Sequence, residues 1–205
     1  MLKPIGRAIG MGVEALKGDA DSSLVHLRAR DESGFGMLEL LMAMVMLNVG
    51  ILAIVAAFSS GNSALARASR ISTAGALADK QMEAYRGLIY NNIVFTTSEW
   101  NAALADSTYT ADTAYTTNML NPVSPKALVS TVTTCPANVP PNACDPSYTT
   151  PGADHRSYRV DTYLYYDAPG GGMQLKSITV VVRPADDTSR FYARVSSTFD
   201  SSTNP

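Results

Sequence analysis

The hydrophobic and polar positions along the chain are very unevenly distributed. From Leu40 to Phe58 the sequence reads LLMAMVMLNVGILAIVAAF, nineteen residues without a formal charge, in which only Asn48 and Gly50 interrupt the aliphatic character. As a helix this block spans about 28 Å, close to the hydrocarbon thickness of about 30 Å. A core helix of a soluble protein would show a polar stripe, and this block has none. The pattern therefore predicts a membrane-spanning helix.

A cleaved secretory signal peptide is the other explanation for an apolar block. The block starts only at position 40, and Phe58-Ser59-Ser60-Gly61 is no convincing cleavage site. The segment after Phe58 is also helical in pattern rather than loop-like. We therefore expect the block to be retained.

Helical patterning continues after the block. Apolar residues recur at three- and four-residue steps from Leu65 to Ile89, and the charged residues mostly fall between them. This predicts one helix from Phe35 to about Tyr90, roughly 84 Å long, that could bend at Ser59–Ser63. Only its first half fits in lipid, so its second half presents an apolar face for a head to cover.

The C-terminal part of the chain predicts three strands in an antiparallel meander. Tyr158–Tyr166, Leu175–Arg183 and Arg190–Phe199 are separated by a triple glycine and by Pro184–Asp187. The fold class expected is α+β, a long N-terminal transmembrane helix packed against a C-terminal antiparallel β-meander. One face of the meander is expected to pack on the helix near Leu77–Ile89.

Residues 96–150 are rich in Thr, Ser, Asn, Ala and Pro and show no long helical period after Leu104. Trp100, the sole tryptophan, is expected to anchor loops from below. The pattern leaves two interpretations open, a loosely ordered connection and a variable surface that distinguishes this protein from its relatives.

Two cysteines, Cys135 and Cys144, enclose eight residues that include three prolines. Zinc needs four ligands and a redox pair uses C-x-x-C, so neither explanation suits this pair. The spacing favours a structural disulfide, which would place the head outside the cytoplasm.

Composition and motifs exclude several classes of function. Sixteen basic against eighteen acidic residues leave no surplus of positive charge for a nucleic acid. Phosphate-binding, metalloprotease and nucleophile-elbow motifs are missing, so we expect no enzyme, no cofactor and no metal site. His155 is expected on the surface. Five aspartates fit no EF-hand spacing and are expected in solvated turns: Asp154, Asp161, Asp167, Asp186 and Asp187.

One carboxylate stands at the start of the apolar stretch. Glu39 is surrounded by apolar residues, where a charge is costly unless it finds a partner or reaches the membrane surface. An ionisable residue in such a place marks function by default, although the side chain could also simply extend to the headgroups.

The residues around Glu39 resemble a known signal. Ser33-Gly34-Phe35-Gly36-Met37-Leu38-Glu39-Leu40 resembles the class III signal of type IV prepilins and pseudopilins. The resemblance implies cleavage between Gly34 and Phe35 by a prepilin peptidase and N-methylation of Phe35. It also implies that Glu39 pairs with the terminal amine of a neighbouring subunit during assembly. The run Asn48–Leu52 resembles minor pilins of the PilV or GspI type.

This resemblance implies a pilin-like lollipop with four parts. These are a cleaved leader (1–34), a transmembrane and assembly half of the helix (35–60), an extramembrane half (61–92) and a globular head (93–205). The implied partners are the prepilin peptidase, other pilin or pseudopilin subunits, the inner-membrane assembly machinery and the lipid bilayer. The leader would be cytoplasmic and the head extracytoplasmic before transfer to a surface filament. The alternative is an unprocessed, single-pass, membrane-anchored extracellular binding module.

Overall fold

The structure is a computed structural model, and it describes residues 36–119, 126, 129, 131–167 and 175–202. It divides the chain into two units, Met1–Ala53 and Ile54–Pro205. The expected leader (1–34), which ends at Gly34, and the expected first mature residue, Phe35, lie outside the described residues.

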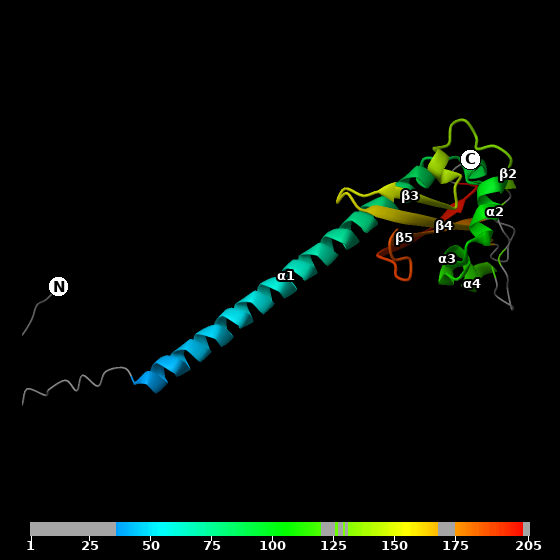
Figure 1. The fold of residues 1–205 in the computed structure, drawn as a ribbon. Helices are drawn as coiled ribbons and strands as arrows, with labels where there is room; N and C mark the ends of the chain where they lie inside the picture. Colours follow the sequence, from blue (N-terminus) through cyan, green and yellow to red (C-terminus); the bar gives the residue numbers. More distant parts are fainter. Residues whose placement is uncertain (1–35, 120–125, 127–128, 130, 168–174, 203–205) are drawn as a thin grey trace, which may run out of the picture. The chain divides into compact units, whose positions relative to one another are not determined.

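Helix α1 runs from Met37 to Arg86 as one element of 50 residues (Figure 1). It is, among the described residues, the single helix long and apolar enough to cross a membrane. The polar run Ser59–Ser63, for which the sequence left a bend open, is continuous α-helix, and the Ser63 hydroxyl donates to the Ser60 carbonyl at 2.8 Å.

The predicted end of α1 near Tyr90 is wrong by one turn, because the helix ends at Arg86. Gly87 follows the last helical residue and donates its N–H to the carbonyl of Glu83 at 3.1 Å. Leu88 then donates to the carbonyl of Tyr85 at 3.1 Å. Glycine directly after the last turn, with these closing bonds, is a common way to end a helix.

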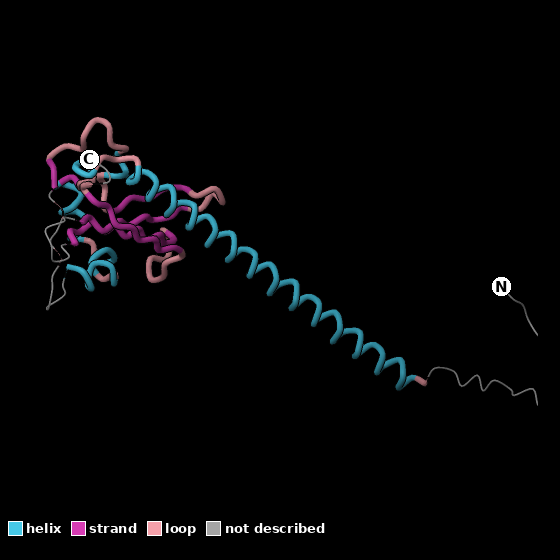
Figure 2. Tube along the Cα trace, turned by 180° about the vertical axis from the view of Figure 1, so that it is seen from behind, coloured by secondary structure: helices cyan, strands magenta, loops and turns pink. Residues whose placement is uncertain are grey.

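A four-stranded antiparallel sheet in the order β3-β4-β5-β6 forms the centre of the larger unit (Figures 1 and 2). Its strands are β3 (Ser147–Pro151), β4 (Ser157–Asp167), β5 (Leu175–Pro184) and β6 (Ala193–Asp200). The α+β class and the consecutive antiparallel order are confirmed.

The strand count is corrected from three to four. The sequence SYTTP of β3 looks like a loop, and it becomes a strand because it pairs with β4 from Ser147 opposite Asp161 to Pro151 opposite Ser157. An edge strand tolerates its proline, which needs no donor on the solvent side. The last strand also begins at Ala193 rather than Arg190.

Short elements connect α1 to the sheet. They are η1 (Tyr90–Asn92), β1 (Phe95–Thr96), α2 (Thr97–Ala105), α3 (Ser107–Thr110), α4 (Thr113–Met119), β2 (Thr131–Val132) and η2 (Pro141–Ala143). Strand β1 pairs with β2 in parallel.

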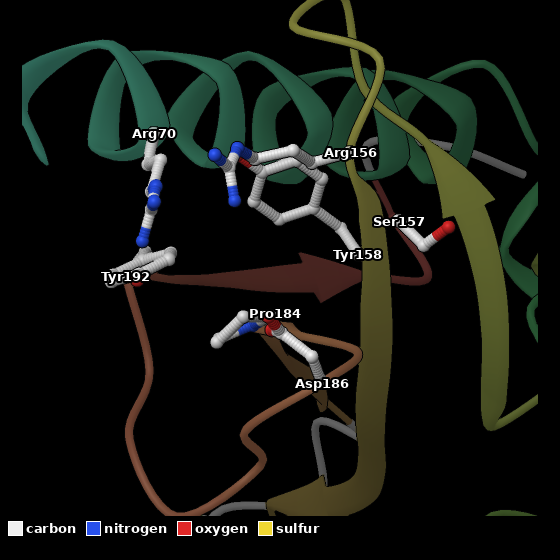
Figure 3. Close-up of a pocket in the computed structure, with 7 residues that line it drawn as sticks. All are labelled: Arg70, Arg156, Ser157, Tyr158, Pro184, Asp186 and Tyr192. Carbon is white, nitrogen blue, oxygen red and sulfur yellow. The ribbon is translucent and has the colours of Figure 1, made fainter. Parts of the chain in front are cut away.

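The sheet is covered on both faces, which the sequence did not predict. Tyr158 of β4 lies under α1 (Figure 3). Side chains alternate between the faces of a strand, so Tyr163 points the opposite way, and it stacks on Tyr109 of α3 with ring centroids 4.4 Å apart. Tyr109 is fully buried and its hydroxyl donates to the carbonyl of Thr162 at 2.6 Å.

Trp100 confirms its expected role as an anchor. It is 6% exposed, stacks on Phe95 and meets Tyr109 edge-on. These rings continue into the Tyr109–Tyr163 stack, so one aromatic series joins β1, α2 and α3 to the sheet. Part of the middle region is therefore ordered core rather than loose connection.

Candidate functional site

Glu39 lies in the first turn of α1 and is exposed. Its backbone N–H donates to the carbonyl of Gly36 at 2.8 Å, which makes this the opening turn of the helix. The partial positive charge of a helix N-terminus favours a carboxylate there. Within the described part of the chain, no basic group lies within ion-pair distance of Glu39.

The apolar side chains that follow Glu39 have no cover from this chain. The large hydrophobic residues from Met37 to Phe58 are between 49% exposed at Leu40 and 86% exposed at Met37. Such a continuous apolar surface is not stable in water, because it is far larger than the patches that soluble monomers expose. It therefore requires lipid or the apolar surface of another molecule.

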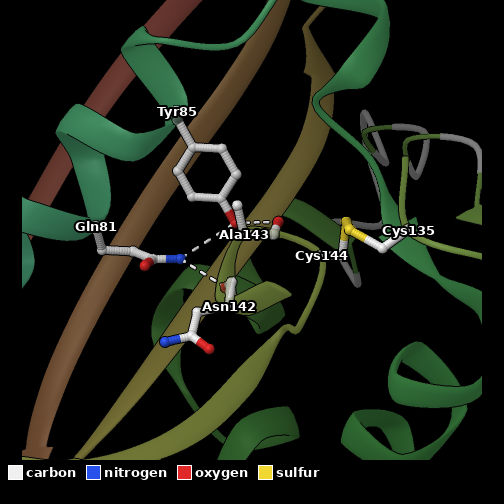
Figure 4. Close-up of a disulfide and its surroundings, with 6 residues drawn as sticks. All are labelled: Gln81, Tyr85, Cys135, Asn142, Ala143 and Cys144. Atoms are coloured by element: carbon white, nitrogen blue, oxygen red, sulfur yellow. Dashed lines mark hydrogen bonds between the residues drawn. A yellow bond between two sulfur atoms is a disulfide. The ribbon is translucent and has the colours of Figure 1, made fainter. Parts of the chain in front are cut away.

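One face of the second half of α1 is buried instead, from Ala74 to Tyr85, and its C-terminal end packs against a loop closed by a disulfide. Cys135 and Cys144 are bonded, with Cα atoms 5.9 Å apart, which confirms the pairing expected from their spacing. Figure 4 shows this loop beside Gln81 and Tyr85 of α1. Cys144 is fully buried in the hydrophobic core.

The loop is held to α1 by its main-chain carbonyls. The Tyr85 hydroxyl donates to the carbonyl of Ala143 at 2.9 Å, and the Gln81 amide donates to the carbonyl of Asn142 at 3.0 Å. The hydroxyl of Tyr148 in β3 donates to the Gln81 side-chain oxygen at 2.9 Å. Burial raises the pKa of Tyr85, so its hydroxyl remains a donor well above neutral pH.

Sequence reasoning missed Gln81 in this role. The only signal was a polar residue between Ala78 and Tyr85 on the face that the pattern assigned to the head. A glutamine at such a position would be costly without partners, so its presence indicates a buried hydrogen bond. Tyr85 was assigned to the right face, but its carbonyl partner lies 58 residues away.

A buried ionic network lies on the face of the sheet opposite α1. Asp161 is fully buried and accepts bonds from Arg159 at 2.7 Å, Arg183 at 2.6 Å and Ser147 at 2.7 Å. The expectation that Asp161 lies in a solvated turn is therefore wrong. The sequence could not reveal this, because Arg183 comes from the next strand, 22 residues later.

The network extends to the short helices. Asp112, which follows α3, accepts from Arg183 and also from Arg194 of β6 at 2.9 Å. Asp106 precedes α3, caps it by accepting the Thr108 N–H at 2.8 Å, and pairs with Arg159. Partial burial opposes ionisation of Asp106, but the ion pair with Arg159 and the bonds from backbone N–H groups together outweigh it and hold the pKa of Asp106 below its usual value. These pairs attach the helices to the sheet.

Across the described ranges, no three His, Cys, Asp or Glu side chains are close enough to share a metal ion. His155 is exposed, as expected, and lies in the β3–β4 turn with a φ of 60°. The features from which a function can be argued are an exposed apolar helix with a carboxylate in its first turn and a head that contains a disulfide-closed loop.

Comparison with protein-family models, with curated proteins and with solved structures found no match to this chain. The functional assignment must come from the residues themselves.

Proposed function

We propose that the chain is the precursor of a minor type IV pilin or pseudopilin. In this proposal a prepilin peptidase cuts after Gly34, Phe35 becomes the N-methylated first residue, and α1 joins the core of a filament. The single observation that carries the proposal is the position of Glu39, a lone carboxylate in the first turn of an exposed apolar helix.

The physical argument concerns how Glu39 is neutralised. An uncompensated carboxylate in the membrane is costly, and in the described part of the chain no cation pairs with it. Cleavage after Gly34 would create a terminal ammonium four residues before Glu39. In a staggered array of parallel helices, the ammonium of one chain reaches the carboxylate of the next, and low polarity strengthens the pair.

The halves of α1 support the same proposal. The first half has uncovered Leu, Ile, Val and Met side chains that sister helices or lipid can contact, and the second half is occupied by the head. The pilin-like lollipop, the inner-membrane location with an extracytoplasmic head, and the later surface filament belong to this proposal.

The decisive measurement is the mass of the mature N-terminus. Chain isolated from cells that contain a prepilin peptidase should begin with N-methyl-phenylalanine at Phe35. Gly34→Leu should leave the full precursor, because a side chain is expected to block the backbone from the peptidase site. Recovery of intact Met1 from the unmodified chain would refute the assignment.

Assembly is tested separately through Glu39→Ala. The variant should be cleaved and inserted normally but should be missing from filaments or cross-linked oligomers. Asp79→Ala is the matched control, since Asp79 is an exposed carboxylate on the same helix outside the apolar block. Equal incorporation of Glu39→Ala and Asp79→Ala would contradict the proposed role of Glu39.

The competing function is a permanently anchored extracellular binding module. The apolar helix and the disulfide favour it as much as they favour a pilin, whereas the Gly34–Glu39 pattern does not. An intact N-terminus together with a monomeric, membrane-retained chain would select this module.

A further inference from the structure

A small pocket lies where α1 passes the turns at one end of the sheet (Figure 3). Arg70 of α1 and Arg156 of the β3–β4 turn project into the same space, with Tyr158 and Tyr192 beside them. Asp186 of the β5–β6 turn completes the wall. The cavity of about 160 Å³ is below the usual range for drug-sized ligands and suits a small polar group.

The arginines of this region differ from the others in the described part of the chain. Five arginines there have a carboxylate within 4.0 Å: Arg86, Arg159, Arg183, Arg190 and Arg194. The three that do not are Arg67, Arg70 and Arg156, and all three line this pocket or the groove that adjoins it. In addition, Nε of Arg70 is shielded from solvent and has no hydrogen-bond partner. Guanidinium groups without a carboxylate partner are thus concentrated in one place.

A tight turn brings Arg156 close to Arg70. Gly152 approaches α1 so closely that a Cβ there would lie 2.5 Å from Thr73 and 2.6 Å from Tyr158. The turn is closed by the Gly152 N–H, which donates to the carbonyl of Arg156 at 2.7 Å. The site is therefore built by the fold, since a larger residue at 152 would push the turn away from the helix.

The residues that line the pocket carry one net unit of positive charge. Asp186 offsets one of the two arginines without forming an ion pair with either. Asp154 is occupied by the Tyr158 hydroxyl at 2.7 Å and by the Arg156 N–H at 3.2 Å. Asp187 is occupied by Arg190. Two guanidinium groups that face one cavity suit an oxyanion, and phosphate oxygens match their planar donors.

The position along α1 indicates where that oxyanion comes from. Leu40–Ala66 contains 27 residues without a formal charge. With Leu40–Phe58 spanning the hydrocarbon core, residues 59–66 continue the helix for about 12 Å beyond it without a charge. Arg67 and Arg70 follow directly, and long basic side chains on a helix lean back toward its N-terminus. Arg67 and Arg70 are thus the first cations beyond the hydrocarbon core on the side of the head, and their side chains lean back toward the membrane surface.

The adjoining groove has the composition of a membrane-surface contact. Arg67, Arg70 and Arg190 line it together with Ile71, Phe191 and Tyr192. Phe191 is 52% exposed, although it is a large apolar residue in a turn. Basic side chains beside exposed aromatic rings are typical of surfaces that meet lipid headgroups.

We propose that the pocket between Arg70 and Arg156 binds the phosphodiester of an anionic phospholipid headgroup while α1 spans the membrane. The guanidinium groups donate to the phosphate oxygens, and Phe191 contacts the adjacent acyl–headgroup boundary. The proposal needs only a membrane-spanning α1, so it holds for a pilin and for an anchored module alike, and its test is independent of cleavage after Gly34.

The test uses the full chain, purified in mild detergent and titrated with phosphatidylglycerol or phosphatidylcholine, with bound lipid counted by native mass spectrometry. The unmodified chain should prefer phosphatidylglycerol. Arg70→Gln with Arg156→Gln should lower that affinity about tenfold or more, as expected for the loss of charge-assisted hydrogen bonds. Lys80→Gln with Arg86→Gln is the matched control, since it removes the same charge from a more distant part of α1 and should leave the affinity unchanged.

Each other outcome would overturn the proposal. No preference for phosphatidylglycerol, or an equal loss in the control pair, would mean that bulk charge governs binding. Displacement of the lipid by an equal concentration of inorganic phosphate would show a free-anion site instead. Lipid binding that disappears as the chain self-associates would assign the pocket to a second copy. Arg70→Lys with Arg156→Lys, which keeps the charge and the packing, should recover part of the affinity if the site is intact.

Discussion

The two halves of α1 differ in which of their side chains the rest of the chain covers. In the first half, large aliphatic residues such as Ile51 and Leu52 remain 51% and 68% exposed. In the second half, the most deeply buried positions include only one large residue without a polar group, Met82, and all are at most 3% exposed: Ala74, Ala78, Gln81, Met82 and Tyr85. Hydropathy alone would predict the reverse.

The difference shows which surroundings each half is built for. The second half has its partners within the chain, so small residues permit close approach and the buried side chains of Gln81 and Tyr85 have specific carbonyl acceptors. The first half has no such partners and presents only a general apolar surface, which suits lipid or sister helices. Substitutions should therefore affect the halves through different measurements.

The largest expected effect is in the head, at Arg183. Arg183→Met removes the cation between two buried carboxylates, Asp161 and Asp112, and leaves both undercompensated. The free energy of unfolding should fall by about 3–5 kcal/mol, the cost of breaking a buried ion pair. Urea unfolding of the full chain in detergent, followed by the fluorescence of Trp100, measures it. Arg190→Met, which breaks an exposed ion pair, should change the free energy of unfolding by less than about 1 kcal/mol. A loss as large as that of Arg183→Met would show that the buried network stabilises the head no more than an exposed pair does.

A charge in the first half should act on membrane insertion alone. Ile51→Arg should disfavour insertion by about 3 kcal/mol or slightly more. The urea midpoint of the head should not move, because Ile51 is not part of the hydrophobic core. Alkali extraction of membranes gives the inserted fraction, and Leu65→Arg, beyond the apolar block, is the control. If both variants stay inserted equally, the apolar block is not the spanning segment.

Loss of the disulfide should have the opposite effect to Ile51→Arg, since it should lower the stability of the head and leave membrane insertion unchanged. Replacing Cys135 and Cys144 by Ala should lower the free energy of unfolding by about 2.5–3 kcal/mol, as chain entropy predicts for a loop of this length. Insertion should remain normal, since the loop is part of the head. The same urea titration and membrane extraction test both statements. A fall in insertion with unchanged stability would contradict the division between the halves.

The smallest expected loss of stability concerns the hydrogen bond between Tyr85, in the second half of α1, and the disulfide loop. Tyr85→Phe keeps the ring but leaves the buried carbonyl of Ala143 without its donor. We expect a loss of about 1–2 kcal/mol. Tyr115→Phe removes the hydroxyl of a half-buried tyrosine that packs on Tyr109, and it should cost less. If Tyr85→Phe and Tyr115→Phe lower the free energy of unfolding equally, the hydrogen bond from Tyr85 to Ala143 makes no specific contribution.

Local patterns predicted the parts of the fold that depend on neighbours in sequence. The apolar period predicted α1, alternation predicted β4 and β5, and eight residues between cysteines predicted the disulfide. Strand β3 escaped prediction because SYTTP has no apolar alternation and becomes a strand only by pairing with β4. The ion pair of Asp161 with Arg183 escaped prediction because Arg183 lies 22 residues later. The end of α1 was missed although Gly87 offered a signal.

The candidate site was only partly predictable for a similar reason. Glu39 stood out because a charge among aliphatic residues is visible in the sequence. Gln81 and the facing pair of Arg70 and Arg156 were not recognised, since their meaning depends on which loops approach α1. Gly34 and Phe35 lie outside the described residues, so their roles remain predictions.

The docking of the disulfide loop on α1 has a consequence for how freely the head can change. Gln81 and Tyr85 bond only the peptide carbonyls of Asn142 and Ala143, and every amino acid supplies such a carbonyl. Ala137 and Asn138, at the exposed tip of the same loop, are therefore open to exchange without disturbing the joint. An epitope tag or a fluorophore inserted there would report on the head in living cells while the disulfide loop stays docked on α1.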